Sequence, residues 1–227
     1  MTDFFRFPHT PHLAWLGAGA PRDGKVLSST DARALLAAEV VVEEKLDGAN
    51  LGISTDSSGS LRLQNRGQYL LPPYGGQFSR LAGWLAARAD VLVPALGDRL
   101  ILFGEWCAAR HSIGYDHLPD WFIAFDIYDR NTQQFWSVRR RDSWAARLDL
   151  SVVPALAYRH MTLSEIEHLA TCSTSRFGKI TLEGVVVRRD GEEFLEGRAK
   201  LVRPDFTQAI GEHWRNRHIE WNTVSPA

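Results

Sequence analysis

The sequence predicts an α+β fold in which largely antiparallel sheets are flanked by helices. Runs rich in β-branched and aromatic residues recur along the chain and stop at Gly, Asp, Asn or Pro, as strands do. Helical patterns fall between these runs without the regular strand–helix alternation of a parallel sheet. The composition is 44% hydrophobic and 23% charged, which is ordinary for a globular protein.

The expected strands are short and mostly apolar. They cover residues 40–46, 50–55, 61–65, 100–106, 121–128, 182–189 and 199–203. The sequence "DSSG" at 56–59 predicts a hairpin turn between the second and third strands.

Four segments have helical character. Residues 77–89 place apolar side chains at helical spacing, and residues 30–38 and 205–218 also favour helices. Thr162 is followed three residues later by Glu165, which predicts a capping box at the start of another helix.

Composition narrows the possible functions. Cys107 and Cys172 form neither a disulfide framework nor a metal-ligand spacing, and the N-terminus lacks a signal-peptide pattern. No apolar run approaches the roughly 18 residues of a membrane span. A cytoplasmic protein without a membrane span is therefore expected. Because the net charge is −1, any binding of nucleic acid must come from a local basic patch.

The sequence Lys45-Leu46-Asp47-Gly48 comes shortly after the apolar run Val40–Val42. A pattern of one Lys, one Asp and one Gly is weak alone, since a lysine at a strand end is often simply solvated. Its weight comes from a series of polar and aromatic residues further along the chain, nearly all in or beside a predicted strand. These are Arg66, Glu105, the pair Phe125-Asp126, Glu183 and Lys200.

This ordered set, over about residues 40–206, resembles the covalent nucleotidyltransferases, namely polynucleotide ligases and mRNA capping enzymes. Within them it is most similar to the ATP-dependent RNA ligases of the phage nick-sealing type. The resemblance implies a ligase adenylation domain with a nucleotide cleft. It also implies that Lys45 becomes covalently linked to AMP and that Mg²⁺ or Mn²⁺ takes part.

The resemblance assigns roles to particular residues. Lys45, Asp47 and Lys200 are the expected catalytic residues, and Glu183 is the expected metal ligand. The nucleotide is expected to contact Glu44, Lys45, Gly48, Asn50, Arg66, Glu105, Phe125, Glu183 and Lys200. Lysine attacks poorly at neutral pH, because its usual pKa is about 10.4. Lys200, Arg66, a metal ion or desolvation is expected to lower the pKa of Lys45.

Several residues depart from the family pattern or leave a choice open. Asn50 stands where DNA ligases and capping enzymes usually carry Arg, whereas the RNA-ligase branch often carries Asn. The last motif usually has two lysines, and here Arg198 replaces the first, so its role is open. Strand alternation predicts that Phe125 and Asp126 point to opposite faces and do not both line one flat wall.

Basic and histidine-rich segments offer weaker signals. Arg203, Arg215 and Arg217 form the best candidate patch for nucleic acid. The arginines at 139–141 indicate a solvated helix start. His111 and His117 match no usual metal-ligand spacing, so a structural role is favoured.

The combined prediction is a single nucleotidyltransferase domain spanning residues 1–227, with no second folded domain. Its expected activity is ATP-dependent joining of RNA 5′-phosphate and 3′-hydroxyl ends. Nucleic acid is the expected partner, and an end-healing polynucleotide kinase is a plausible companion. The alternatives are a DNA nick ligase, a GTP-using capping enzyme and a catalytically inactive nucleic-acid-binding module.

Overall fold

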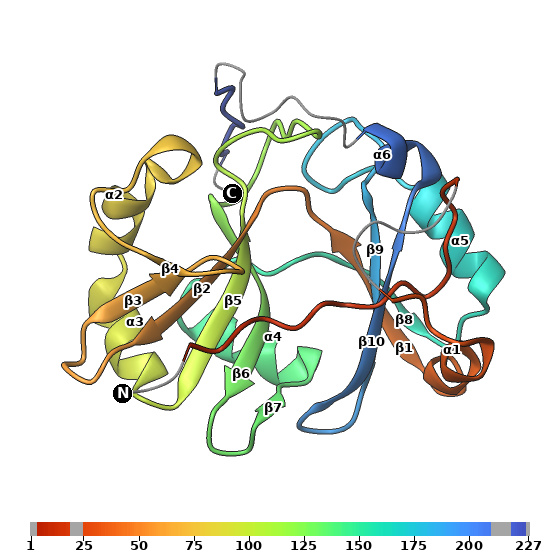
Figure 1. Cartoon of the computed structure of the whole chain (residues 1–227), viewed down its shortest axis with the longest axis horizontal. Coiled ribbons are helices and arrows are strands. Elements are labelled where there is room, and N and C mark those ends of the chain that lie inside the picture. Colours follow the sequence, from red (N-terminus) through yellow and green to blue (C-terminus); the bar gives the residue numbers. More distant parts are fainter. Residues whose placement is uncertain (1–3, 19–24, 210–218, 226–227) are drawn as a thin grey trace.

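The computed structural model describes residues 4–18, 25–209 and 219–225, which form two antiparallel sheets with helices packed against them (Figure 1). One sheet has the strand order β10-β9-β1-β8, and the other has the order β4-β3-β2-β5-β6-β7. The α+β class is therefore confirmed. The strands are β1 (Val40–Lys45), β2 (Ala49–Thr55), β3 (Leu61–Gln64), β4 (Tyr69–Leu70), β5 (Leu100–Trp106), β6 (Phe122–Asp129), β7 (Gln134–Phe135), β8 (Ala155–Arg159), β9 (Gly184–Asp190) and β10 (Leu195–Val202).

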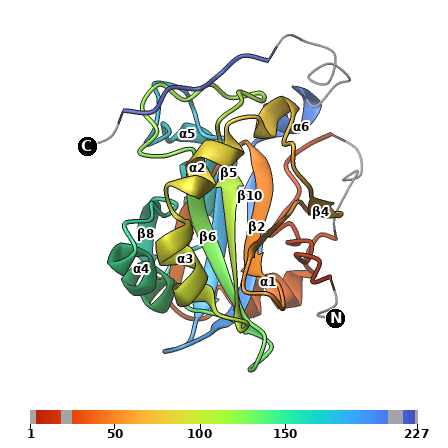
Figure 2. The same cartoon turned by 90° about the vertical axis from the view of Figure 1, so that its left-hand side faces the viewer.

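The helices cover one face of each sheet (Figures 1 and 2). Apolar side chains of α2, α3 and α4 share a core with the six-stranded sheet, and those of α1 and α5 share a second core with the four-stranded sheet. The helices are α1 (Ser29–Leu35), the 3₁₀ turn η1 (Gly76–Phe78), α2 (Leu81–Ala86), α3 (Ala89–Leu96), α4 (Val138–Arg147), α5 (Leu163–Cys172) and α6 (Pro204–Ala209).

The link between β1 and β2 carries the chain from one sheet to the other. Lys45 is the last residue of β1 and pairs with Gly184 in β9. Ala49 begins β2 and pairs with Trp106 in β5. Only Leu46, Asp47 and Gly48 lie between the two strands. The Lys-x-Asp-Gly motif therefore lies at the junction of the sheets.

Most predicted elements are present. The capping box of Thr162 and Glu165 is confirmed. The turn at 56–59 is also confirmed, with the Asp56 amide donating to the Ser60 carbonyl and Gly59 at a φ of 80°. The short strands β4, β7 and β8 were not predicted. They have two, two and five residues, and none shows a clear alternation of buried and exposed side chains.

Two helix predictions need correction. Residues 77–89 do not form one helix, because η1, α2 and α3 are separate and Arg88 at the break bonds to Asp120 at 2.6 Å. The arginines at 139–141 do lie at a helix start, but Arg141 is not solvated. Its side chain is 1% exposed and pairs with Glu43 at 2.6 Å.

The predicted terminal helix is described only as far as α6. Phe206 is buried with Val202 and Leu46, as expected for a helix packed on the core. Arg215 and Arg217 lie outside the described residues. Across the described ranges, no helix combines the length and the apolar character needed to cross a bilayer.

Candidate active site

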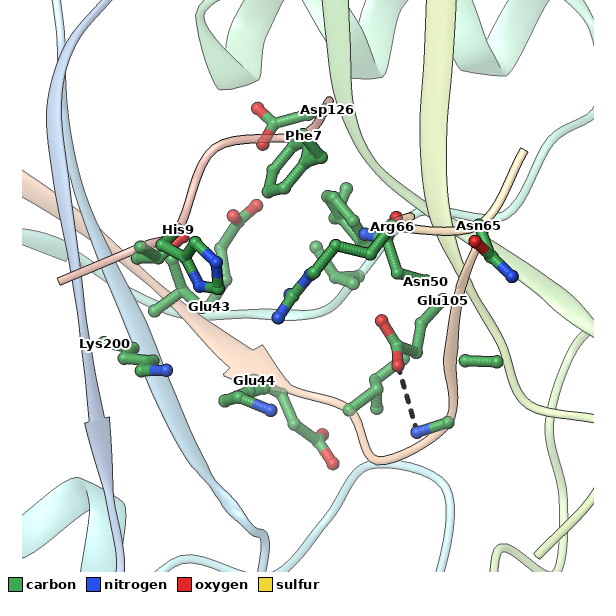
Figure 3. A pocket seen from close by; sticks show the side chains of 18 of the residues that line it. Phe7, His9, Glu43, Glu44, Asn50, Asn65, Arg66, Glu105, Asp126 and Lys200 are labelled. Atoms are coloured by element: carbon green, nitrogen blue, oxygen red, sulfur yellow. Dashed lines mark hydrogen bonds between the residues drawn. The ribbon is translucent and has the colours of Figure 1, made fainter. Parts of the chain in front are cut away.

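A cavity of about 580 Å³ brings together most of the residues that the sequence singled out. It is lined by β1, β9 and β10 from one sheet, by β2, β5 and β6 from the other, and by the loop after β3 (Figure 3). Among its walls are the predicted residues Glu44, Lys45, Gly48, Asn50, Arg66, Glu105, Phe125 and Lys200.

Lys45 lines this cavity and is paired with Glu183. Gly184 is opposite Lys45 in the β1–β9 register, so the preceding residue, Glu183, lies beside Lys45. The Lys45 Nζ lies 2.5 Å from the Glu183 Oε1, with side-chain exposures of 27% and 7%. This contact brings a potential nucleophile and a potential metal ligand together.

The charges around Lys45 correct the expectation of a lowered pKa. Burial alone would lower the pKa of Lys45, but Glu183, Glu105 and Asp47 together raise it above its usual value. Lys45 is therefore a protonated ammonium in this state. An attack by its nitrogen requires that the proton leave first.

At the two glutamates, Glu105 and Glu183, burial outweighs the neighbouring charges in setting the pKa, the reverse of the balance at Lys45. Burial raises the pKa of Glu105 to about 8 and that of Glu183 to about 7, although Lys45 opposes both shifts. Carboxyls that titrate near neutrality can accept or release a proton at physiological pH. We call Lys45, Glu105, Glu183 and Lys200 the reactive cluster.

The turn at Asp47 and Gly48 is held by specific contacts. The Asp47 Oδ2 accepts hydrogen bonds from the amides of Ser112 and Ile113 at 2.7 and 2.8 Å. Gly48 has no room for a side chain, since a Cβ there would lie 2.6 Å from the Trp106 carbonyl oxygen. Its amide instead donates to the Glu105 Oε1 at 3.1 Å. Asp47 thus anchors a loop, and a catalytic role for it stays a prediction.

Phe125 and Asp126 both line the cavity, although strict strand alternation would point them to opposite faces. The β5–β6 register explains why. Phe103 pairs with Asp126 but Gly104 pairs with Ala124, which leaves Phe125 as the extra residue of a β-bulge. A bulge re-aims side chains and breaks strict alternation. Beside the bulge, Gly104 leaves room for the Phe122 ring, since a Cβ at Gly104 would lie 2.4 Å from it.

Arg198 and Lys200 share one face of β10, as predicted, and both line the cavity. Arg198 is nevertheless 9% exposed, pairs with Asp126 and lies over the rings of Phe7 and Phe135 at 4.6 and 4.4 Å. Its guanidinium is therefore held in place by the fold as well as facing the cavity.

Comparison with known proteins identifies the family. The profile of the RNA ligase family matches residues 38–202. The chain belongs to the RNA ligase family. No individual curated protein sequence matched it.

Solved structures of RNA ligases share the fold. A mutant of the Naegleria gruberi RNA ligase with ATP and Mn has 18% identity and a TM-score of 0.65, with 92% of this chain and 59% of that chain covered. The same ligase with PPi has 21% identity and a TM-score of 0.61, covering 92% and 64%.

An archaeal ATP-dependent RNA ligase has 21% identity and a TM-score of 0.58, covering 87% of this chain and 48% of that chain. The present RNA ligase family member thus spans roughly half to two thirds of the length of these relatives.

Two further residues of this RNA ligase family member present polar groups to the cavity. The Asn50 Oδ1 is buried without a hydrogen-bond partner among the described residues, and such an atom usually has a ligand or water as partner. Arg66 extends from the loop after β3 towards the centre of the cavity (Figure 3). That loop is shaped by Asn65, whose Oδ1 accepts from the amides of Gly67 and Gln68.

Glu44 lines the cavity, but two of its polar groups are already engaged. Its Oε2 accepts from the Arg176 amide at 2.9 Å, and its own amide donates to the Pro154 carbonyl at 2.9 Å. A contact of Glu44 with the nucleotide, which the family resemblance implies, must therefore come from atoms other than this amide.

Two other predicted residues lie in supporting positions. His111 is hydrogen-bonded to Gln77 at 2.6 Å, and the described residues contain no cluster of three His, Cys, Asp or Glu fit for a metal. Arg203 is partly buried and pairs with Asp205 at 3.3 Å. Its contact with nucleic acid stays a prediction.

The sequence reasoning missed a buried set of charges at one end of the cavity. We call Glu43, Asp126, Arg141, Arg188 and Arg198 the inner ion cluster. Arg188 pairs with Asp126 at 2.7 Å and lies 3.9 Å from Glu43. Glu43 shares the face of Lys45 on β1, and this alternation was the available signal.

The residues fit a divalent metal held partly by phosphate. The Glu183 Oε2 is buried and has no partner among the described residues. Mg²⁺ is often bound through one or two carboxylates together with phosphate oxygens, and Glu183 meets that requirement.

Proposed function

We propose that the chain is an ATP-dependent RNA ligase that joins a 5′-phosphate to a 3′-hydroxyl through a lysyl-AMP intermediate at Lys45. The observation that carries the proposal is the position of the Lys45 Nζ. It lies in a cavity that also presents Lys200 and Phe125, and 2.5 Å from Glu183. Family membership supports the same activity.

The first step exchanges one bond at phosphorus for another. Lys45 loses a proton to water in the cavity, and its Nζ then attacks the α-phosphorus of ATP. A P–N bond forms, the P–O bond to the β-phosphate breaks, and pyrophosphate leaves with that electron pair. Lys200 supplies positive charge to the α-phosphate in the transition state.

Two transfers follow from the enzyme–AMP adduct. A 5′-phosphate oxygen of the RNA attacks the AMP phosphorus, so that the P–N bond breaks and Lys45 is released. The 3′-hydroxyl then loses its proton and attacks the activated 5′-phosphorus, and AMP departs. In this scheme Phe125 stacks on adenine, worth about 1–3 kcal/mol, and Glu105 accepts from a ribose hydroxyl.

A divalent ion, held by Glu183 and phosphate oxygens, would neutralise charge on the phosphates when bound. Mg²⁺ or Mn²⁺ is the proposed ion. Nucleic acid is the proposed partner, with a polynucleotide kinase as a source of 5′-phosphates. Cys107 and Cys172 are free thiols, which fits the reducing cytoplasm.

Labelling with radioactive ATP or GTP tests the first step. We expect ATP alone to label the protein, with one added AMP at Lys45 by mass spectrometry. Labelling by GTP would indicate a capping-type enzyme, and no labelling by either would indicate an inactive binding module.

Sealing of matched nicks tests the substrate. We expect joining on all-RNA or hybrid nicks in the presence of ATP. Joining of the all-DNA nick alone would replace the RNA ligase assignment with a DNA nick ligase.

A further inference from the structure

The N-terminal segment Phe4–Leu13 crosses the cavity, although it lies outside the part of the chain that matches the family profile. We call this segment the strap. It runs from the six-stranded sheet to β10 of the other sheet (Figure 1). It contributes Phe7, His9 and Thr10 to the cavity wall.

The first half of the strap is anchored on the six-stranded sheet. Phe5 stacks on Tyr128 with a centroid distance of 3.8 Å, and its carbonyl accepts from the Gln64 Nε2 at 2.7 Å. Phe7 is 5% exposed and contacts the rings of Phe103 and Phe125 at 4.9 and 5.4 Å. This anchor therefore touches the residue proposed to stack on adenine.

The second half is anchored on Lys200 itself. The Lys200 amide donates to the Pro11 carbonyl at 2.8 Å, and the Leu13 amide donates to the Lys200 carbonyl at 2.8 Å. His12 is 4% exposed beside this pair. Burial, with Lys200 and Lys45 nearby, lowers the pKa of His12 to about 4, so its ring is neutral at pH 7.

His9 is held between these two anchors. It is two residues from Phe7 and two from Pro11, so its backbone has little freedom. Its imidazole lies exposed at the cavity wall, on the same side as Lys200 and facing the guanidinium of Arg66 (Figure 3). Within the ranges that the structure describes, no hydrogen bond or ion pair engages the His9 ring.

We propose that His9 is a phosphate-binding residue of this site. An imidazole N–H beside a lysine and an arginine is suited to donate to a phosphate oxygen. The proposal rests on the proposed function, which supplies two sources of phosphate, namely the triphosphate of ATP and the 5′-phosphate of RNA.

Equilibrium binding tests the proposal without relying on catalysis. Titration calorimetry would compare ATP, supplied as its unreactive α,β-methylene analogue so that no AMP is transferred to Lys45, with AMP and 5′-phosphorylated RNA. Each would be titrated with Mg²⁺ into the intact protein and into His9→Ala and His9→Gln. His160→Ala is the matched control, because His160 is an exposed histidine outside the cavity wall. His9 is exposed, so folding should survive, and thermal melting would verify it.

We expect His9→Ala to weaken binding of ATP or of 5′-phosphorylated RNA by about 10-fold, the usual effect of losing one hydrogen bond to a charged group. His9→Gln should recover part of the affinity, since its amide also donates. A loss for ATP but not AMP would place His9 at the β- or γ-phosphate, and a loss for both would place it at the α-phosphate. A loss confined to RNA would place it at the 5′-phosphate.

Unchanged affinity of His9→Ala for all three ligands would overturn the proposal, as would a wild-type protein that binds none of them. The proposed function fails separately, if the wild-type protein binds ATP but forms no adduct at Lys45.

Discussion

The inner ion cluster and the reactive cluster hold similar numbers of charged side chains but differ in how fully those charges are paired. In the inner ion cluster, Arg188 and Arg198 bind Asp126, and Arg141 binds Glu43. In the reactive cluster, Lys45 pairs with Glu183, yet the pKa values of Glu183 and Glu105 both remain strongly raised. Compensated charges hold the two sheets together, whereas incompletely compensated charges are available for chemistry. Perturbed pKa values often mark such functional positions.

The largest loss of activity is expected when the proposed nucleophile of the reactive cluster is removed. Lys45→Ala should abolish the AMP adduct and ligation from ATP, because the proposed first step uses the Lys45 nitrogen as nucleophile. Joining of a pre-adenylated strand should persist in part, since that step uses no lysine nucleophile. Mass spectrometry and gel ligation would measure both, and an adduct retained at another lysine would contradict the assignment.

Removing a member of the inner ion cluster should instead cost stability. Arg188→Met leaves Asp126 and Glu43 without one of their buried partners. Breaking a buried pair typically lowers the free energy of unfolding by about 3–5 kcal/mol.

Arg159→Ala is the control for Arg188→Met, because Arg159 and Glu165 form an exposed pair at 2.8 Å. Its cost should stay under about 1 kcal/mol. Urea denaturation would measure both variants, and equal costs would show that the inner ion cluster is not specially stabilising.

Lys200→Ala should reduce the rate of adenylation by roughly 10²–10³, as loss of a charge-stabilising donor often does. Thermal stability should change little in comparison, because the Lys200 backbone contacts with the strap remain. Single-turnover kinetics with labelled ATP would measure the rate. An adenylation rate within about twofold of wild type would remove Lys200 from the catalytic assignment.

Glu105→Gln should make the protein more stable at alkaline pH. The folded-state pKa of Glu105 is about 8, above its usual value, so between about pH 5 and 8 the folded state binds more protons than the unfolded state. Wild-type stability from this group therefore falls as pH rises through that window. The variant lacks this loss. Melting temperatures should coincide near pH 4 and favour the variant at pH 9.

The smallest effect is expected for Arg198→Lys. Lysine keeps the charge beside Asp126 but loses the planar contact with Phe7 and Phe135. Because the positive charge is kept, adenylation should fall by less than the roughly 10²–10³ of a lost charge-stabilising donor, with a small decrease in melting temperature. A loss as large as that of Lys200→Ala would move Arg198 into the reactive cluster.

The sequence predicted those parts of the site that depend on local strand pattern. Lys45, Glu105 and Lys200 lie in or at the ends of strands, and motif order together with strand ends was enough to group them. The bulge at Phe125 escaped prediction, because it is a shift in the register between β5 and β6, which only the pairing of the two strands reveals. Burial of Arg141 depends on its contact with Glu43, which is distant in the sequence. The strap has no periodicity, so nothing in its residues indicated its path across the cavity.

The short link between β1 and β2 fixes how far Lys45 can lie from the six-stranded sheet. Lys45 is fixed in one sheet and Ala49 in the other, and four residue steps span at most about 14 Å. An inserted residue would lengthen the tether, and a deletion would pull Gly48 away from Glu105. The number of residues within the motif is thus set by the separation of the two sheets.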